Sequence, residues 1–293
     1  MSIEVIHLTH CYSEGSVLRT VALDDVSFRV ENGEFIGIIG HTGSGKSTLV
    51  QHLNGLLKPT SGQILVDGQD LNGEHVNRRA LRQRIGLVFQ YPEYQLFEET
   101  VFKDICYGLK KMGIEKAKMH KMAYDAALMV GLSNDEVNSS PFELSGGQKR
   151  RAAMAGVLAM QPGILVLDEP ASGLDPRGRQ EMFAIIKKLR DSGTTIILVS
   201  HNMDEAAVNC DRICLIDHGK IKAIGTPEEL FIKERAEELG IQRPRISRFS
   251  GLLQEKLRKE FPGIIFEGMN FSPEKEAQSI VRSVCRAGGA DVQ

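Results

Sequence analysis

The stretch that decides the fold is Gly40-His41-Thr42-Gly43-Ser44-Gly45-Lys46-Ser47-Thr48, which fits the phosphate-loop pattern G-x-x-x-x-G-K-[ST]. It lies between an apolar run typical of a strand, 35–39, and a helical run that begins at Lys46. Glycines let the backbone curl so that its N–H groups converge on phosphate oxygens, and the N-terminus of the following helix favours the anion. We therefore expect residues 40–48 to hold the phosphates of a nucleotide, with Lys46 on the terminal phosphates and the Ser47 hydroxyl on Mg²⁺. A glycine-rich turn with an accidental lysine is the alternative, and the flanking strand and helix argue against it.

A second motif places two adjacent carboxylates at the end of an apolar run, Ile164-Leu165-Val166-Leu167-Asp168-Glu169. The run predicts a buried parallel strand, and ligands of open α/β sheets bind at the carboxyl ends of such strands. Asp168 is expected in the Mg²⁺ shell, and Glu169, on the opposite side of the strand, is expected to act as the general base. A strand that ends in a solvated acidic pair would explain this motif alone. Its combination with the phosphate loop favours the catalytic interpretation.

A third motif, Leu144-Ser145-Gly146-Gly147-Gln148, precedes a helical run of small residues. Ser145 is well placed as the N-cap, and the two glycines leave bare N–H groups at the start of the helix. A capping turn is one explanation. The other is a second phosphate-binding site, which is unexpected if one chain binds a single nucleotide.

The pattern of apolar runs indicates the fold class. Short runs alternate with helical patterns over residues 1–225, which is typical of an α/β fold with a largely parallel sheet. Asp217-His218-Gly219 predicts a hairpin turn that closes this part. Residues 92–143 lack a strong strand pattern and are expected to form a mainly helical insert. The expected strands cover residues 35–39, 64–67, 85–89, 164–168, 195–199 and 213–217.

The C-terminal part has a different composition, charged and helical in pattern after Pro227. Segment 234–248 is expected to connect to a small C-terminal helical appendage. A helix of that appendage would place its apolar residues on one face, which must be buried against another element. These apolar residues are Phe249, Leu252, Leu253, Leu257 and Phe261. The last six residues, 288–293, are expected to fray.

Composition excludes several classes of protein. The 293 residues are 42% hydrophobic, which is enough for one large domain with a modest appendage. The 36 basic residues nearly balance the 38 acidic ones, which argues against a nucleic-acid-binding surface spread over the whole molecule but leaves a local basic patch open. No apolar run approaches the roughly 20 residues of a membrane helix, and no secretory signal is visible, so we expect a cytoplasmic protein. The five scattered cysteines indicate reduced thiols and no disulfide framework.

The three motifs, followed by a strand that ends in Ser200-His201, occur in the order found in ABC-family nucleotide-binding domains. The resemblance covers residues 3–228 and implies a P-loop NTPase fold of the ABC type that binds ATP and Mg²⁺ and hydrolyses the ATP. It also implies an ABC ATPase domain at 1–228 with a helical subdomain at about 92–160. The helical appendage at 229–293 is then expected to make dimer contacts.

The resemblance assigns roles to three more residues. Tyr12 matches the aromatic residue that stacks on adenine. Gln90 matches the glutamine that touches Mg²⁺ or the attacking water, and His201 matches the switch histidine that contacts the γ-phosphate and holds the water with Glu169. The alternatives are an exposed strand tyrosine, a polar loop residue and a structural histidine.

Family geometry implies how the two anion sites would combine. In a head-to-tail dimer, Ser145, Gly147 and Gln148 would cap the nucleotide that Lys46 of the opposite subunit holds. The loop around Asp175 would cross to that subunit. ATP would then join the two chains, and hydrolysis would reopen the dimer.

A narrower resemblance is carried by Gln90-Tyr91-Pro92-Glu93-Tyr94-Gln95-Leu96-Phe97, which is similar to a loop of the ATPase subunits of energy-coupling-factor importers for vitamins and metal ions. It implies a peripheral protein on the cytoplasmic face of the cell membrane. Its partners would be a second ABC ATPase, identical or homologous, an integral membrane scaffold subunit and a substrate-binding membrane subunit. The scaffold would dock in a cleft beside Gln90, anchored by Tyr91, Tyr94, Leu96 and Phe97. A non-transport ABC ATPase is the alternative, although such proteins usually carry two cassettes or a long coiled coil.

Overall fold

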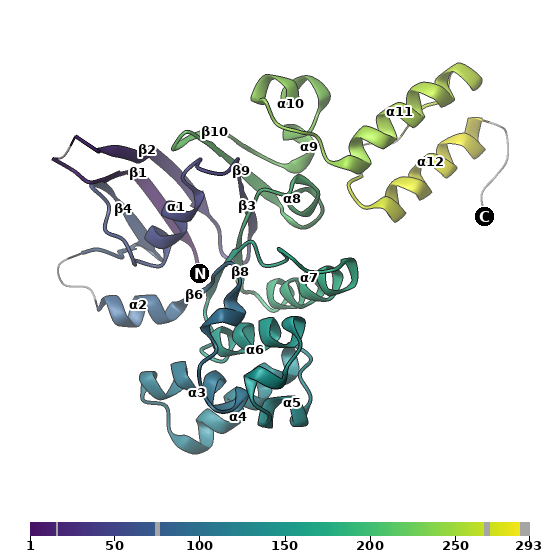
Figure 1. Ribbon diagram of the computed structural model, residues 1–293. Helices are drawn as coiled ribbons and strands as arrows, with labels where there is room; N and C mark the ends of the chain where they lie inside the picture. The colour runs from purple at the N-terminus through teal and green to yellow at the C-terminus, as the bar shows by residue number, and fades with distance from the viewer. Residues whose placement is uncertain (16, 74–76, 267–269, 288–293) are drawn as a thin grey trace.

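The centre of the molecule is a six-stranded sheet in the order β10-β9-β3-β8-β7-β6, parallel except for β10 (Figure 1). The computed structural model describes residues 1–15, 17–73, 77–266 and 270–287. Five of the six strands expected from the sequence belong to this sheet, with ends that differ by at most one residue. The strands are β3 (Phe35–Ile39), β6 (Ile85–Val88), β7 (Ile164–Asp168), β8 (Thr195–Ser200), β9 (Arg212–Asp217) and β10 (Lys220–Gly225). The predicted turn at 217–219 joins β9 to β10.

The central strands are apolar on both faces because both faces of the sheet are covered. Successive side chains of a strand point to opposite sides, so β3 contributes to two separate cores. Phe35 and Ile39 pack with the helical insert on one side. Ile36 and Ile38 pack with a second sheet and with α1 (Lys46–Leu53) on the other. The continuous apolar runs of the sequence therefore correspond to strands buried on both sides.

A second, antiparallel sheet has the order β2-β1-β4-β5 and is not anticipated by the sequence patterns. The strand expected at 64–67 lies in this sheet and not in the parallel one. Shifts of register near Leu8 and His10 mark bulges in β1, which break the regular alternation by which a strand is recognised. The strands are β1 (Ile3–Tyr12), β2 (Thr20–Val30), β4 (Ser61–Val66) and β5 (Gln69–Asp70).

The insert after Gln90 is helical, as predicted, and forms the lower part of the molecule in Figure 1. Helix α3 is capped at both ends by its own sequence: Thr100 accepts a hydrogen bond from the Lys103 N–H at its start, and Gly113 ends it at a positive φ of 76°. Ile105, Leu109 and neighbouring apolar residues bury the insert against β6 and β7. The insert comprises the 3₁₀ helices η1 (Pro92–Gln95) and η2 (Pro141–Glu143) and the α-helices α3 (Val101–Met112), α4 (Lys116–Met129), α5 (Asn134–Asn138) and α6 (Gly146–Leu158).

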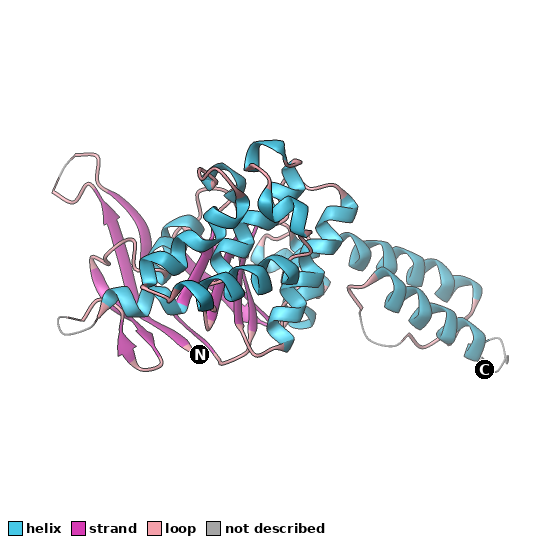
Figure 2. Cartoon of the chain, turned by 90° about the horizontal axis from the view of Figure 1, so that it is seen from below, coloured by secondary structure: helices cyan, strands magenta, loops and turns pink. Residues whose placement is uncertain are grey.

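The remaining helices surround the sheets and form the C-terminal appendage, in which α11 and α12 lie side by side and project from the rest of the molecule (Figures 1 and 2). Segment 234–248 is more than a connection, because α10 begins at Lys233. These helices are α2 (Arg78–Arg84), α7 (Pro176–Asp191), α8 (Met203–Asn209), α9 (Pro227–Leu230), α10 (Lys233–Leu239), α11 (Arg245–Glu260) and α12 (Pro273–Ala287).

The apolar face expected on α11 is only partly buried, so that expectation is wrong for two of its residues. Phe249 and Leu252 are 60% and 70% exposed. The face that meets α12 carries small polar residues instead, and Ser250 donates a hydrogen bond to Glu276, which is 2% exposed. Periodicity identified the helix but not the face that its neighbour covers.

Two further expectations bear on the chain as a whole. All five cysteines are free, as the sequence predicts. Among the described helices, none is both long and apolar enough to cross a membrane. The expected fraying of residues 288–293 falls outside the described residues.

Candidate nucleotide-binding and catalytic site

The phosphate loop connects the end of β3 to the start of α1, as the motif requires. Gly45 has a φ of 105°, a conformation that side chains disfavour, and a Cβ on Gly40 would lie 2.2 Å from the Ile216 carbonyl oxygen. Lys46 Nζ donates to the carbonyl oxygens of Gly40 at 2.7 Å and His41 at 2.8 Å, so the loop curls around the lysine. Burial lowers the pKa of Lys46, and the carboxylates of Glu169 and Asp168 oppose that shift.

The two carboxylates lie at the carboxyl end of β7, opposite the phosphate loop. Glu169 follows the strand with a positive φ of 51°, unusual for a residue with a side chain. Burial raises the pKa of Asp168 to about 6, the Glu169 carboxylate adds to this effect, and Lys46 opposes it. A bound Mg²⁺ would favour the ionised form of this partly buried carboxylate and so oppose the effect of burial.

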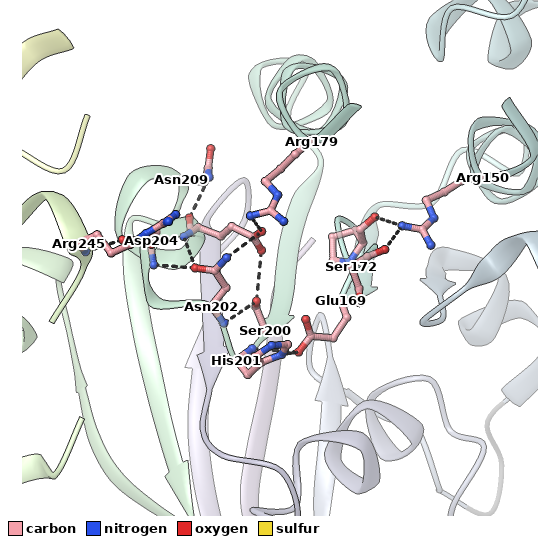
Figure 3. A network of polar contacts seen from close by, with 12 residues as sticks. Arg150, Glu169, Ser172, Arg179, Ser200, His201, Asn202, Asp204, Asn209 and Arg245 are labelled. Atoms are coloured by element: carbon pink, nitrogen blue, oxygen red, sulfur yellow. Dashed lines mark hydrogen bonds and ion pairs between the residues drawn. The ribbon is translucent and has the colours of Figure 1, made fainter. Parts of the chain in front are cut away.

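The switch histidine lies directly against the expected general base. His201 follows β8, its backbone N–H donates to Glu169 Oε1 at 2.9 Å, and its Nδ1 lies 2.5 Å from the same oxygen (Figure 3). The Glu169 side chain is only 12% exposed, whereas that of His201 is 66% exposed. The carboxylate is thus held in place by a residue that is itself open to a ligand.

One cavity of about 470 Å³ brings most of the predicted residues together. Tyr12 is part of its lining, and the Tyr12 hydroxyl lies 3.3 Å from Thr48 Oγ1. The cavity is therefore lined by segments that are widely separated in the sequence, as an active site requires. The predicted residues that line it are Tyr12, Thr42, Gly43, Gly45, Lys46, Ser47, Thr48, Gln90, Asp168, Glu169 and His201.

Some predicted residues of the phosphate loop do not line this cavity. The Ser44 side chain is buried beneath the loop, with no hydrogen-bond partner for its hydroxyl among the described residues. His41 turns toward β9, where its Nδ1 lies 2.8 Å from the Thr42 carbonyl oxygen and its Nε2 lies 2.5 Å from Asp217 Oδ1. The contacts with Thr42 and Asp217 raise the pKa of His41. We conclude that His41 shapes the loop from outside the cavity.

The third motif lies at the start of α6 and away from this cavity. Ser145 is the N-cap, and its hydroxyl oxygen accepts a hydrogen bond from the Gln148 backbone N–H at 3.4 Å. In return, the Ser145 backbone N–H donates to Gln148 Oε1 at 2.7 Å. The capping turn considered for this motif is therefore present. Ser145, Gly147 and Gln148 are absent from the lining of the cavity beside Lys46.

Arg150 is a buried residue of the site region that sequence reasoning missed. It is 4% exposed and forms an ion pair with Glu93 of η1 at 2.9 Å. It also donates to the carbonyl oxygen of Ser172 at 2.5 Å, in the loop after Glu169 (Figure 3). Arg150 thus joins the insert to the catalytic edge of the sheet. Arg150 lies between Lys149 and Arg151 in a basic run, which gives no sign that one of the three is buried, and its partners lie far away in the sequence.

Two buried histidines, His10 and His52, pack against each other, and His52 contacts Thr48, the last residue of the phosphate loop. His52, on α1, is fully buried; its Nδ1 lies 2.7 Å from the Thr48 carbonyl oxygen, and its ring packs edge-on against that of His10 at 4.5 Å. Its Nε2 and both ring nitrogens of His10 are buried without a described partner. Burial lowers the pKa of His52, and the backbone oxygen of Thr48 opposes this shift. His52 is therefore neutral in the folded protein at pH 7.

This environment predicts acid sensitivity. A histidine whose pKa is lowered by folding destabilises the fold once the pH falls below its unfolded pKa of about 6.5, because the unfolded chain then binds the proton more readily. His52→Asn keeps a donor toward Thr48 but cannot take up the proton. We expect urea unfolding of the wild type to show a larger loss of stability between pH 7 and 5 than the variant. Equal losses in both proteins would contradict this assignment.

Comparisons with known proteins give a consistent result. The sequence model of the family described as "ABC transporter" matches residues 23–172. The chain is 50% identical over 258 residues to the energy-coupling factor transporter ATP-binding protein EcfA2 of Caldanaerobacter subterraneus, covering 87% of this chain and 90% of the relative. It is 46% identical over 280 residues to the EcfA2 of Clostridium perfringens, covering 94% and 97%.

Solved structures resemble the fold. The cbiO1 protein of Clostridium perfringens, described as part of the ABC transporter complex cbiONQ, superposes with a TM-score of 0.73 at 34% identity, covering 86% of this chain and 98% of that one. The dimeric ATP-binding cassette MJ0796, described in a post-hydrolysis state with ADP and Pi, gives a TM-score of 0.69 at 28% identity, covering 77% and 98%.

Proposed function

Because the chain belongs to the ABC transporter family, and within it to the ATP-binding proteins of energy-coupling-factor transporters, we propose that the cavity beside Lys46 is where it hydrolyses Mg-ATP. The protein is an ATP-binding and hydrolysing subunit that energises an importer of this class. Its close relatives favour this function over the non-transport ATPase considered from the sequence.

The observation that carries the catalytic assignment is the convergence of five residues on one cavity. Lys46, Gln90, Asp168, Glu169 and His201 come from four separate segments of the chain, yet all of them line the same space. If each of these residues had only a structural role, the five would not need to line the same cavity. Their meeting point also adjoins the phosphate loop, which supplies backbone N–H groups for a triphosphate.

The donor set fits magnesium. Ser47, Gln90 and Asp168 offer a hydroxyl, an amide and a carboxylate oxygen to the cavity, and Mg²⁺ prefers hard oxygen ligands with several of its positions left for water or phosphate. These three residues would hold the ion, which supplies neutralisation of phosphate charge when bound. Burial raises the pKa of Asp168 to about 6, so its carboxylate is available to the ion at pH 7 but would be lost as a ligand in mildly acidic solution.

Glu169 is the proposed general base for the attack of water on the γ-phosphate. Both contacts from His201 go to Oε1, which fixes the carboxylate and leaves Oε2 to take the proton from water. His201, being largely exposed on the cavity side, is placed to turn toward the γ-phosphate. Lys46 would then stabilise the charge that develops on the phosphate oxygens. Tyr12, 41% exposed, offers its ring to the base.

A second ABC ATPase subunit would complete the site. Ser145, Gly147 and Gln148 form a helix start with bare N–H groups that does not line the nucleotide cavity of their own chain. A head-to-tail dimer would bring that helix start to the nucleotide of the opposite chain and exclude water from it. The dimeric state described for the MJ0796 cassette agrees with such an arrangement. We also assign residues 1–228 to the ATPase domain and 229–293 to an appendage that takes part in dimer contacts.

The loop after Gln90 is the proposed docking surface for an integral membrane scaffold, which would itself join a substrate-binding membrane subunit. Tyr94 and Phe97 are 84% and 61% exposed, and Tyr91 is 40% exposed. Leu96 instead packs against the core, so it is a weaker candidate for an anchor. Large exposed aromatic groups close together are typical of protein interfaces. Docking here would hold the protein peripherally at the cytoplasmic face of the cell membrane.

Charge introduced at this loop tests the transport function. Tyr94→Asp should leave the ATPase activity of the isolated protein within about twofold of the wild type, because its side chain is solvated. It should abolish co-purification with integral membrane proteins and uptake of the solute in cells, since a buried charge without a partner opposes association. Leu128→Asp, at a position on α4 that is 75% exposed, is the matched control. Normal uptake by the Tyr94 variant would place the docking surface elsewhere.

A further inference from the structure

A chain of polar contacts leads from the first residue of α11, in the appendage, to His201 (Figure 3). Helix α11 begins at Arg245, and its backbone N–H donates to Asp204 Oδ1 at 2.6 Å. The Nε of the same arginine donates to Asp204 Oδ2, also at 2.6 Å. Two bonds to the two oxygens of one carboxylate fix its orientation as well as its position.

Asp204 belongs to the first turn of α8, which begins two residues after His201. The N-cap of this helix is Asn202, whose side-chain oxygen accepts from the Asp204 N–H at 3.0 Å. The Asn202 N–H in turn donates to Ser200 Oγ at 3.0 Å. His201 is therefore held in a three-residue loop whose two neighbours are bonded to each other and to α8.

A second anchor holds the same loop from the core. Glu205, 9% exposed, accepts bonds from Ser200 Oγ at 3.3 Å and from Asn202 Nδ2 at 3.2 Å. It also pairs with Arg179 of α7 at 3.5 Å. This tie lies entirely within the ATPase domain. Among the described residues, the polar contact that links the appendage to this loop is therefore the one between Arg245 and Asp204.

We propose that Arg245 and Asp204 are positioning residues through which the C-terminal appendage holds the switch loop and sets how His201 faces Glu169. The inference rests on the proposed ATPase function and adds a role for the appendage in the rate of hydrolysis. A cavity of about 280 Å³ beside this tie is lined by His201, Asn202, Asp204 and Arg245, among others. The loop therefore has room to shift when the tie is broken.

Breaking the pair of Arg245 and Asp204 is expected to lower kcat for ATP hydrolysis by a modest factor. The Arg245 side chain is 75% exposed and that of Asp204 is 29% exposed, and ion pairs this open to water have small energies. We expect about a two- to fivefold fall in kcat for Arg245→Ala. The KM for ATP should stay unchanged, because neither residue lines the nucleotide cavity.

The experiment compares steady-state ATP hydrolysis by the full-length chain and five variants. Arg245→Ala and Asp204→Asn should each lower kcat, and the double variant should fall no further than the lower single one, because the two side chains act as a pair. Arg245→Lys should restore most of the rate, since its ammonium group can still reach the carboxylate. Arg248→Ala, one turn along α11 and lining the same small cavity, is the control and should match the wild type.

Three outcomes would overturn the proposal: a kcat for Arg245→Ala equal to that of the Arg248 control, additive losses in the double variant, or no recovery with lysine. A fall in kcat that only follows a fall in melting temperature would also overturn it, since the role would then be structural. The proposed function fails in a different way. In that case the wild type itself would show no Mg-ATP hydrolysis.

Discussion

Replacing Lys46 by alanine is expected to abolish tight binding of Mg-ATP. The side chain is the cation of the phosphate loop, and its ammonium group now bonds the carbonyl oxygens of Gly40 and His41. In the complex with Mg-ATP, the ammonium group would donate its hydrogen bonds to the terminal phosphates and no longer to these carbonyl oxygens. Hydrogen bonds to charged groups each contribute about 1.5–3 kcal/mol, so the loss of two predicts a roughly 10²- to 10⁴-fold weaker affinity. Titration of ATP against the purified protein, by calorimetry, measures this directly.

The control for this prediction is Lys121→Ala, which removes an exposed lysine of α4 far from the phosphate loop in the sequence. Its affinity for ATP should equal that of the wild type. Circular dichroism should confirm that both variants remain folded. Unchanged affinity and turnover in the Lys46 variant would show that residues 40–48 do not hold the nucleotide.

Replacing Glu169 by glutamine should separate binding from hydrolysis. The amide oxygen can still accept the His201 N–H, so the nearly isosteric change should preserve the fold and ATP binding. It cannot take a proton from water, and loss of a general base slows catalysis by roughly 10²- to 10⁴-fold. Single-turnover hydrolysis gives the rate, and size-exclusion chromatography with ATP should show that an ATP-bound dimer accumulates.

Glu237→Gln provides the comparison, since Glu237 is an exposed glutamate of α10 and is not among the residues that line the cavity. Its hydrolysis rate should match that of the wild type. A wild-type rate in the Glu169 variant would mean that another group removes the proton. His201, the neighbour of Glu169 in the cavity, would then be the next candidate.

The parts of the site that could be predicted from the sequence are those whose chemistry is local. The phosphate loop needs glycines and a lysine at fixed offsets between a strand and a helix, so residues 40–48 can be recognised from the sequence alone. The strand that ends in Asp168 and Glu169 is buried on both faces, and its apolar run is correspondingly continuous. Ser145 could be predicted as an N-cap because capping depends on residues within one turn.

The parts that could not be predicted depend on pairing between distant segments. Strand β1 is interrupted by bulges, so its alternation is weak, and nothing in residues 64–67 indicates that their partner is the N-terminal strand. The bond between Arg245 and Asp204 and that between Arg150 and Glu93 join residues far apart in the chain. Charged residues in helices are usually solvated, so neither pair stands out in the sequence.

The face of α11 that α12 covers also could not be predicted from the sequence. Periodicity identified an amphipathic helix, but Ser250 bonds to Glu276 of α12 while Phe249 and Leu252 stay exposed. Helix packing selects a face by the shape and polarity of the partner, which a single helix does not encode. The exposed pair agrees with the proposed part of the appendage in dimer contacts.

The central claim is that this chain hydrolyses ATP at a site completed by a second subunit. The most direct test is the initial rate of phosphate release from Mg-ATP as a function of protein concentration, with the full-length chain at saturating ATP. We predict a rate per chain that rises with concentration and reaches a plateau as dimers form, and that Ser145→Arg abolishes this rise while ATP binding is retained. A rate per chain that is constant at every concentration, and equal in wild type and Ser145→Arg, would contradict the account.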